Sequence, residues 1–128
     1  MDFIVGGVNY KAAKLPAIKQ FHLIRRLAPV MANLTNPDEA IEGIANAIGE
    51  LKDEEANYVL FGLLGCVERE QPPHGWAKIT VGESIMFQEI DLVELMQIAA
   101  KSFQANFGDF LGKLPSDLTG AIPKPNVP

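Results

Sequence analysis

The chain begins with two short apolar runs separated by a pair of glycines. The runs are residues 3–5 and 8–12, and Gly6 and Gly7 supply the positive φ angles that a two-residue β-turn requires. We therefore expect a β-hairpin at the N-terminus. Because strands of this length are not stable alone, a helix should pack against one face of the hairpin.

Apolar residues recur at helical spacing over most of the remaining chain. Pro16 suits a first helical turn, and Asn36 can cap a second helix. Asp53 and Asp91 can cap two further helices. Pro29 should kink or break the first helix, because its ring clashes with the carbonyl four residues earlier and it has no N–H to donate. The predicted helices cover residues 16–34, 37–51, 53–68 and 91–114.

The third predicted helix is apolar on nearly all sides, so we expect it at the centre of the core. Gly62 and Gly65 would let a neighbouring helix approach closely, at a cost in helix propensity of about 1 kcal/mol each relative to alanine. A loop and a second hairpin follow, with strands 76–81 and 84–88 around Gly82. The predicted fold class is α+β, predominantly α: an N-terminal hairpin, about four helices, and a second hairpin before the last helix.

Prolines concentrate at the C-terminal end of the chain. Four of the nine fall within residues 115–128, where each removes a backbone donor and favours an extended conformation. A length of 128 residues suits one domain. We expect a single globular domain over residues 1–114 and a proline-rich mobile tail over 115–128.

The first predicted helix is apolar over more than half of its surface. One stripe, which includes Ile18 and Phe21, fits a core-facing side. A neighbouring face also consists of large apolar residues, and two arginines stand beside it. Because one small core cannot easily cover both faces, we expect part of the second face to be exposed in a monomer and covered by an acidic partner helix in use. The residues predicted to form this partner interface are Leu23, Arg25, Arg26, Leu27 and Val30.

The composition is that of an ordinary globular protein, with 48% hydrophobic and 21% charged residues. The net charge of −5 disfavours nucleic acid as a partner, because binding to it depends on neutralising phosphates. The longest nearly uncharged apolar stretch, residues 56–67, is too short to cross a membrane as a helix. The first residues lack the basic and apolar regions of a signal peptide, so we expect a cytoplasmic protein.

The charge is divided unevenly along the chain. Residues 1–26 contain five basic and one acidic side chain, a net charge of +4. Residues 27–128 contain six basic and fifteen acidic side chains, a net charge of −9. This division suits solvated surfaces, but it also favours a complementary contact with a partner or head-to-tail self-association.

Few residues suit catalysis or metal binding. His22 and His74 are far apart in the sequence, and Cys66 lies in an apolar helix without a neighbouring base. The paired acids stand in first helical turns, where the positive end of the helix dipole explains why acidic residues are favoured. We interpret residues 68–70 as a charged surface at the end of a helix. The glycine pair opens no helix, so it does not indicate a phosphate site. We predict no catalytic residue, cofactor or metal site.

Three segments of the N-terminal part occur in a recognisable order. The hairpin Phe3–Tyr10 leads to Lys14-Leu15-Pro16, and then to Gln20-Phe21-His22-Leu23-Ile24-Arg25-Arg26-Leu27-Ala28-Pro29-Val30. This part, residues 3–30, resembles the small tail assembly chaperones of tailed bacteriophages and prophages. The remainder agrees with them in being an acidic, helix-rich body with a loose C-terminus.

The resemblance implies a non-enzymatic protein without a cofactor. Such chaperones coat the long helical tape measure protein, help to recruit tail tube protein during assembly in the host cytoplasm, and are absent from the mature virion. Family members often occur in a short and a frameshift-extended form. The implied role is physically reasonable, because a tape measure protein cannot bury its apolar surface alone before assembly, and an apolar helix can cover that surface.

Two other classes of function remain open. A phage virion structural or adaptor protein, such as a head–tail joining component or a minor tail component, would be retained in the particle. A small enzyme or ligand-binding domain would bind a small molecule, which a thermal-shift screen detects. Analysis of purified particles separates the first of these from a chaperone.

Overall fold

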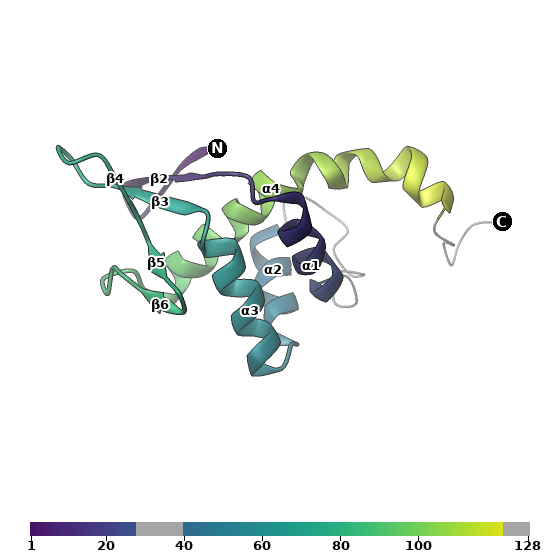
Figure 1. Cartoon of the computed structure of the whole chain (residues 1–128), viewed down its shortest axis with the longest axis horizontal. Helices are drawn as coiled ribbons and strands as arrows, with labels where there is room; N and C mark the ends of the chain where they lie inside the picture. The colour runs from purple at the N-terminus through teal and green to yellow at the C-terminus, as the bar shows by residue number, and fades with distance from the viewer. Residues whose placement is uncertain (28–39, 122–128) are drawn as a thin grey trace.

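The computed structural model describes residues 1–27 and 40–121. Within them the fold is α+β and combines a four-stranded sheet, a two-stranded hairpin and four helices (Figure 1). The predicted fold class is confirmed. In chain order the elements are β1 (Asp2–Val5), β2 (Val8–Ala12), α1 (Ala17–Leu27), α2 (Ala40–Gly49), α3 (Asp53–Leu64), β3 (Val67–Glu70), β4 (Trp76–Lys78), β5 (Thr80–Val81), β6 (Ser84–Ile85) and α4 (Leu92–Ala121).

The sheet has the strand order β1-β2-β3-β4, and each neighbouring pair is antiparallel. Strands β1 and β2 form the predicted hairpin, with Gly6 at a φ of 59° and Gly7 at 77° in its turn. Phe3 and Tyr10 are paired across the two strands, and their rings stack with centroids 5.7 Å apart. Both are buried, whereas Ile4, the next residue of β1, points to the other side of the sheet and is exposed. One face of the sheet therefore enters the core.

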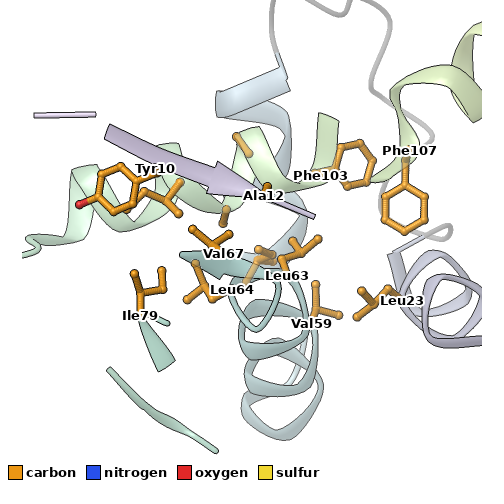
Figure 2. Packing of buried hydrophobic residues seen from close by; sticks show 14 of the residues in the cluster. Tyr10, Ala12, Leu23, Val59, Leu63, Leu64, Val67, Ile79, Phe103 and Phe107 are labelled. Carbon is orange, nitrogen blue, oxygen red and sulfur yellow. The ribbon is translucent and has the colours of Figure 1, made fainter. Parts of the chain in front are cut away.

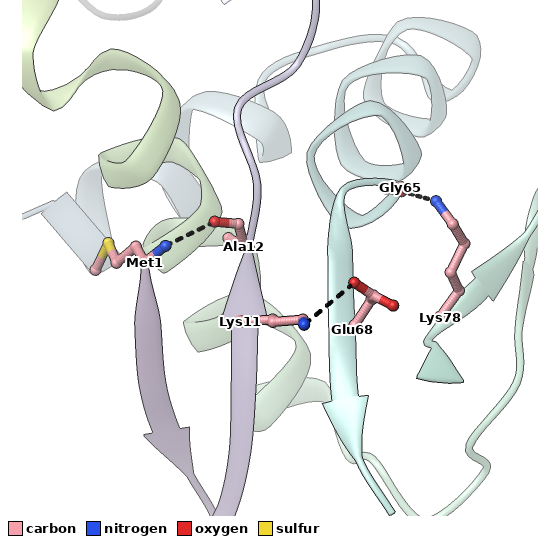
Figure 3. Close-up of polar contacts among 6 residues, drawn as sticks. All are labelled: Met1, Lys11, Ala12, Gly65, Glu68 and Lys78. Carbon is pink, nitrogen blue, oxygen red and sulfur yellow. Dashed lines mark hydrogen bonds and ion pairs between the residues drawn. The ribbon is translucent and has the colours of Figure 1, made fainter. Parts of the chain in front are cut away.

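Polar contacts hold the strands together at their ends and on the outward face (Figure 3). The N-terminal ammonium of Met1 donates to the carbonyl of Ala12 at 2.9 Å, and the N–H of Ala12 donates to the carbonyl of Met1 at 2.8 Å. Between β2 and β3, Lys11 Nζ lies 3.9 Å from Glu68 Oε1. Because both of these side chains are partly exposed, the ion pair contributes little to stability.

The core lies between the inward face of the sheet and the helices (Figure 2). Helix α4 contacts β1, β2, α2 and α3, so it joins the two layers. Helix α3 contacts α1, α2 and α4, which confirms its predicted central position. The largest fully buried apolar side chains are Leu23, Leu27, Val59, Leu63, Leu64, Val67, Ile79 and Ile98.

Helices α1 and α3 approach closely at Gly62. A Cβ atom placed there would lie 2.7 Å from Leu23 Cδ2, which is closer than van der Waals contact allows. The predicted role of this glycine is confirmed, and its partner is α1. The other predicted glycine, Gly65, instead ends α3, where its N–H donates to the carbonyl of Phe61 at 2.9 Å.

The third helix is shorter than the sequence predicts. It ends at Leu64, and residues 67–70, which we expected at its end, form strand β3 between β2 and β4. The prediction was wrong because three cross-strand pairs to β2 outweigh the local helix preference. Asp53 is likewise the first helical residue rather than the cap, which is Lys52.

Arg69 is not the surface residue of a helix end that we expected. It lies on β3, its side chain is 13% exposed, and its guanidinium carbon lies 4.6 Å from the centre of the Phe87 ring. Arg69 Nη1 also lies 3.0 Å from Glu89 Oε1. These contacts attach the segment before α4 to the sheet.

The second predicted hairpin is divided between two sheets. Trp76–Lys78 pairs with β3, and only Thr80–Val81 pairs with Ser84–Ile85, around a turn in which Gly82 has a φ of 59°. The predicted cap of the last helix is confirmed. The N–H of Glu94 donates to Asp91 Oδ1 at 2.8 Å, and the N–H of Asp91 donates to Glu94 Oε1 at 3.2 Å, which together form a capping box.

Several boundaries fall near residues that the structure does not describe. The observed α1 ends at Leu27, and both Pro29 and Asn36 lie outside the described residues. At the other end, α4 continues past Leu114 to Ala121, where the sequence predicts an extended chain. The division into a domain and a mobile tail stays a prediction.

Two buried polar side chains on α4 connect the elements around it. Ser102 Oγ donates to the carbonyl of Leu63 at 2.6 Å. One turn later, Asn106 Oδ1 accepts from the N–H of Leu15 at 2.7 Å, and Asn106 Nδ2 donates to the carbonyl of Ala13 at 3.3 Å. Gln20 Nε2 of α1 donates to Asn106 Oδ1 at 3.2 Å. The amide of Asn106 therefore fixes the β2–α1 connection, and with it α1, on α4.

Replacing Asn106 by leucine should lower the free energy of unfolding by about 1–3 kcal/mol, because the N–H of Leu15 and the carbonyl of Ala13 lose their partner. Urea unfolding followed by circular dichroism measures the change. The matched control is Gln104→Leu on the same helix, a half-buried position that should be near neutral. Equal unfolding midpoints for the two variants would contradict this role of Asn106.

Candidate interaction surface

The described residues contain no group of three or more His, Cys, Asp or Glu side chains that could hold a metal ion. His22 lies on α1, and His74 lies in the exposed loop between β3 and β4. Cys66, which we expected within a helix, lies between α3 and β3, and its Sγ lies 3.2 Å from Ser102 Oγ. Neither histidine is hydrogen-bonded to this thiol within the described part, so these three side chains form no nucleophile–base pair.

The group around Tyr10 is the other candidate for chemistry. Burial raises the pKa of the Tyr10 hydroxyl above its usual 10.0, Arg69 opposes the shift, and Glu94 and Glu89 add to it. A raised pKa keeps the phenol neutral near pH 7, so Tyr10 is not activated as a base or nucleophile. The group joins the sheet to α4 and has a structural role.

We expected part of the face formed by Leu23, Leu27 and Val30 to be exposed in a monomer, but Leu23 and Leu27 are completely buried, so for these two residues the prediction was wrong. Leu23 faces α3, where Gly62 leaves space for its side chain. Val30, the third apolar residue of that predicted face, lies outside the described residues. The leucines therefore cannot contact a partner while α1 stays in place.

The exposed apolar face of α1 is the one that we assigned to the core. Ile18 is 66% exposed, Phe21 is 53% exposed, and Arg25 is exposed beside them. The three residues are spaced by three and four positions, so they share one side of the helix. We call Ile18, Phe21 and Arg25 the outer face of α1.

The two predicted interface arginines have different surroundings. Arg26 is half-buried, and its guanidinium carbon lies 3.9 Å from the centre of the Tyr58 ring on α3. Lys19 Nζ lies 4.3 Å from the same ring centre. Arg26 Nη1 also donates to the carbonyl of His22 at 3.4 Å. Arg26 therefore helps to attach α1 to α3, and Arg25 is the arginine on the outer face.

A groove of about 370 Å³ lies beside this contact. It is bordered by the start of α1, by α3 and by the turn between β5 and β6. Sequence reasoning missed the groove, because its residues come from three separate segments of the chain. The lining residues are Leu15, Lys19, Asn57, Tyr58, Phe61, Gly62, Gly65, Gly82 and Glu83.

Large exposed apolar side chains also occur away from α1. Leu92 and Val93 at the start of α4 are 72% and 65% exposed, and Ile4 on β1 is 67% exposed. The outer face of α1 differs from these positions in having a basic side chain on the same helix face. In the described part of the chain, no helix is long and apolar enough to cross a membrane.

Comparison with known protein families gives a match over most of the chain. The family model described as "Phage tail assembly chaperone protein, TAC" matches residues 6–119, which is most of the chain. No curated protein and no solved structure matches it. The family match extends well beyond residues 3–30, on which the sequence resemblance rests, and includes α1, α3 and most of α4. The chain therefore belongs to the phage tail assembly chaperone family.

Proposed function

We propose that this chain is a non-enzymatic chaperone that binds the tape measure protein and assists assembly of the tail tube in the host cytoplasm. Membership of the tail assembly chaperone family supports a role in tail assembly. The observation that carries the choice of partner is the outer face of α1, where Ile18 and Phe21 are both more than half exposed. Two large apolar side chains on one helix face are suited to packing against another helix.

The chemistry of this face fits a temporary contact with a long helical protein. Before the tail tube surrounds it, a tape measure protein exposes an apolar stripe that promotes aggregation. Phe21 and Ile18 can cover part of such a stripe, and Arg25 can pair with an acidic residue beside it. Because the face is small, many copies would be needed along one tape measure protein, and each could be displaced by tube subunits.

The proposed interface differs from the one predicted from the sequence in its apolar residues. Arg25 stays in the proposal, whereas Leu23 and Leu27 are replaced by Ile18 and Phe21, because the leucines are buried. The division of charge along the chain keeps self-association as a further expectation. Light scattering at low and high salt tests it, and a strict monomer at both would remove it.

The alternative is a virion structural or adaptor protein that stays in the particle. The same exposed apolar face supports it, because a permanent interface also needs such a surface. Mass spectrometry of purified particles separates the two functions. A chaperone is present in the infected host and absent from the particle, whereas an adaptor is present in a fixed number of copies.

Replacing Phe21 by serine should weaken binding to the tape measure protein by about tenfold or more, because buried aromatic residues dominate interfaces. Co-purification of the co-expressed pair measures this loss. The matched control is Leu92→Ser, which removes an exposed apolar side chain from a different surface. If both variants bind like the unchanged protein, the outer face of α1 is not the interface.

Charge reversal at the two arginines should separate stability from binding. Arg26→Glu should lower the free energy of unfolding by about 1 kcal/mol, because the contact with Tyr58 is lost. Arg25→Glu should change stability by less than about 0.5 kcal/mol, since its side chain is exposed, but it should weaken binding. Thermal unfolding and co-purification measure the two effects. Equal stability losses for both variants would contradict the assignment.

A further inference from the structure

The start of α4 forms a second exposed apolar surface, and this one is acidic. Leu92 and Val93 in its first turn are 72% and 65% exposed. Asp91, which caps the helix, is exposed next to them. We call Asp91, Leu92 and Val93 the α4 tip. Residues 79–100 contain four acidic and no basic side chains, so the sequence around the tip has a uniformly negative charge.

The outer face of α1 has the same apolar character and the opposite charge. Ile18 and Phe21 are 66% and 53% exposed, and Arg25 is exposed on the same side of the helix. Residues 1–26, which include most of α1, have a net charge of +4. The two surfaces therefore match each other in both respects: each offers two large apolar side chains, and the charges beside them are of opposite sign.

The two surfaces lie too far apart to meet within one molecule. Asn106 of α4 accepts a hydrogen bond from Gln20 of α1, which places the middle of α4 beside α1. Leu92 lies fourteen residues earlier on the same helix, a distance of about 21 Å at 1.5 Å per residue. In Figure 1, α4 begins beside β6 on the left, and α1 lies to the right of α3. A contact between these surfaces must therefore join two copies of the chain.

We propose that copies of this chain associate head to tail, with the outer face of α1 in one copy packed on the α4 tip of the next. Arg25 of the first copy then faces Asp91 of the second. The contact is heterologous, so each copy keeps one free surface of each kind at the ends of a row. It is also weak, because a few side chains bury much less than the about 1,600 Å² of a standard stable interface.

This inference goes beyond the proposed function, because its partner is a second copy of the chain. At low concentration the monomer leaves Phe21 exposed, and at high concentration the next copy covers it. The tape measure protein would occupy the same outer face of α1, so the two contacts exclude each other. Self-association thus covers the apolar surface of the chaperone until its partner displaces the neighbouring copy.

Mixing two variants tests the proposal on this chain alone. Phe21→Ser removes an aromatic ring from the outer face of α1, and Leu92→Ser removes a leucine from the α4 tip. Ile4→Ser is the matched control, since Ile4 is 67% exposed on β1 and belongs to neither surface. Sedimentation velocity over a range of concentrations measures association, and melting temperatures at low concentration check that each variant is folded.

The unchanged protein and Ile4→Ser should sediment faster as the concentration rises, whereas Phe21→Ser and Leu92→Ser should each stay monomeric. An equal mixture of the two monomeric variants should form a dimer and grow no further. One intact contact is available in that mixture, between the outer face of the Leu92→Ser copy and the α4 tip of the Phe21→Ser copy.

The charges should contribute in a way that is measured separately. Arg25→Glu should weaken the association of the chain several-fold, because it places an acid opposite the acidic tip. Its control is Lys52→Glu, which reverses an exposed base that belongs to neither surface and should leave the association unchanged. Added salt should weaken the association of the unchanged protein, since the charges are exposed.

Three results would each overturn the proposal. A monomer at every concentration up to the solubility limit would show that copies do not associate through these surfaces. Association that persists in Leu92→Ser but is lost in Phe21→Ser would indicate a symmetric contact between two outer faces. A mixture of the two folded variants that stays monomeric would show that the outer face and the α4 tip do not bind each other.

Discussion

The buried amide of Asn106 determines which side of α1 faces the core. Its oxygen accepts from the backbone of Leu15 and from Gln20, and its nitrogen donates to the carbonyl of Ala13. A buried amide with all of these partners stabilises one arrangement, because any other leaves polar groups without hydrogen bonds. Gln20 is thereby turned toward α4, and Leu23 is turned toward Gly62 of α3. Ile18 and Phe21 are left on the outside.

This arrangement gives the molecule an apolar face on a helix that polar contacts attach to α3 and α4. Two cations over the ring of Tyr58 attach the side of α1 next to α3. Arg25 lies on the exposed side and adds charge to it. Exposed apolar side chains promote aggregation unless charged residues separate them. A basic residue beside Phe21 is therefore suited to a chaperone that has not yet bound its partner.

Much of the fold was predictable from local signals. Gly6 and Gly7 specified the hairpin, and Asp91 specified the start of α4, because both signals act within a few residues. Strand β3 was not predictable in this way, since its residues form a strand only by pairing with β2, more than fifty positions earlier. The residues next to β3 in the sequence do not indicate that it will pair with so distant a strand.

That α1 contacts a partner stays a prediction. The sequence correctly leaves Arg25 exposed, but it places Leu23 and Leu27 on the exposed side and Ile18 and Phe21 on the core side, and the structure shows the opposite for these four residues. Both faces have the same periodicity, and the choice between them depends on Asn106 and Gly62, which lie far away in the sequence. Arg26 was assigned to the interface for a similar reason, because its neighbour Tyr58 belongs to another helix.

The central claim is that α1 presents Ile18 and Phe21 to the tape measure protein while Leu23 stays in the core. Hydroxyl-radical footprinting with mass spectrometry measures the accessibility of these side chains directly, in the free protein and in the complex. The account predicts that Phe21 is modified and Leu23 is protected in the free protein, and that Phe21 becomes protected in the complex while Leu92 does not. Strong modification of Leu23 in the free protein, or unchanged modification of Phe21 in the complex, would contradict it.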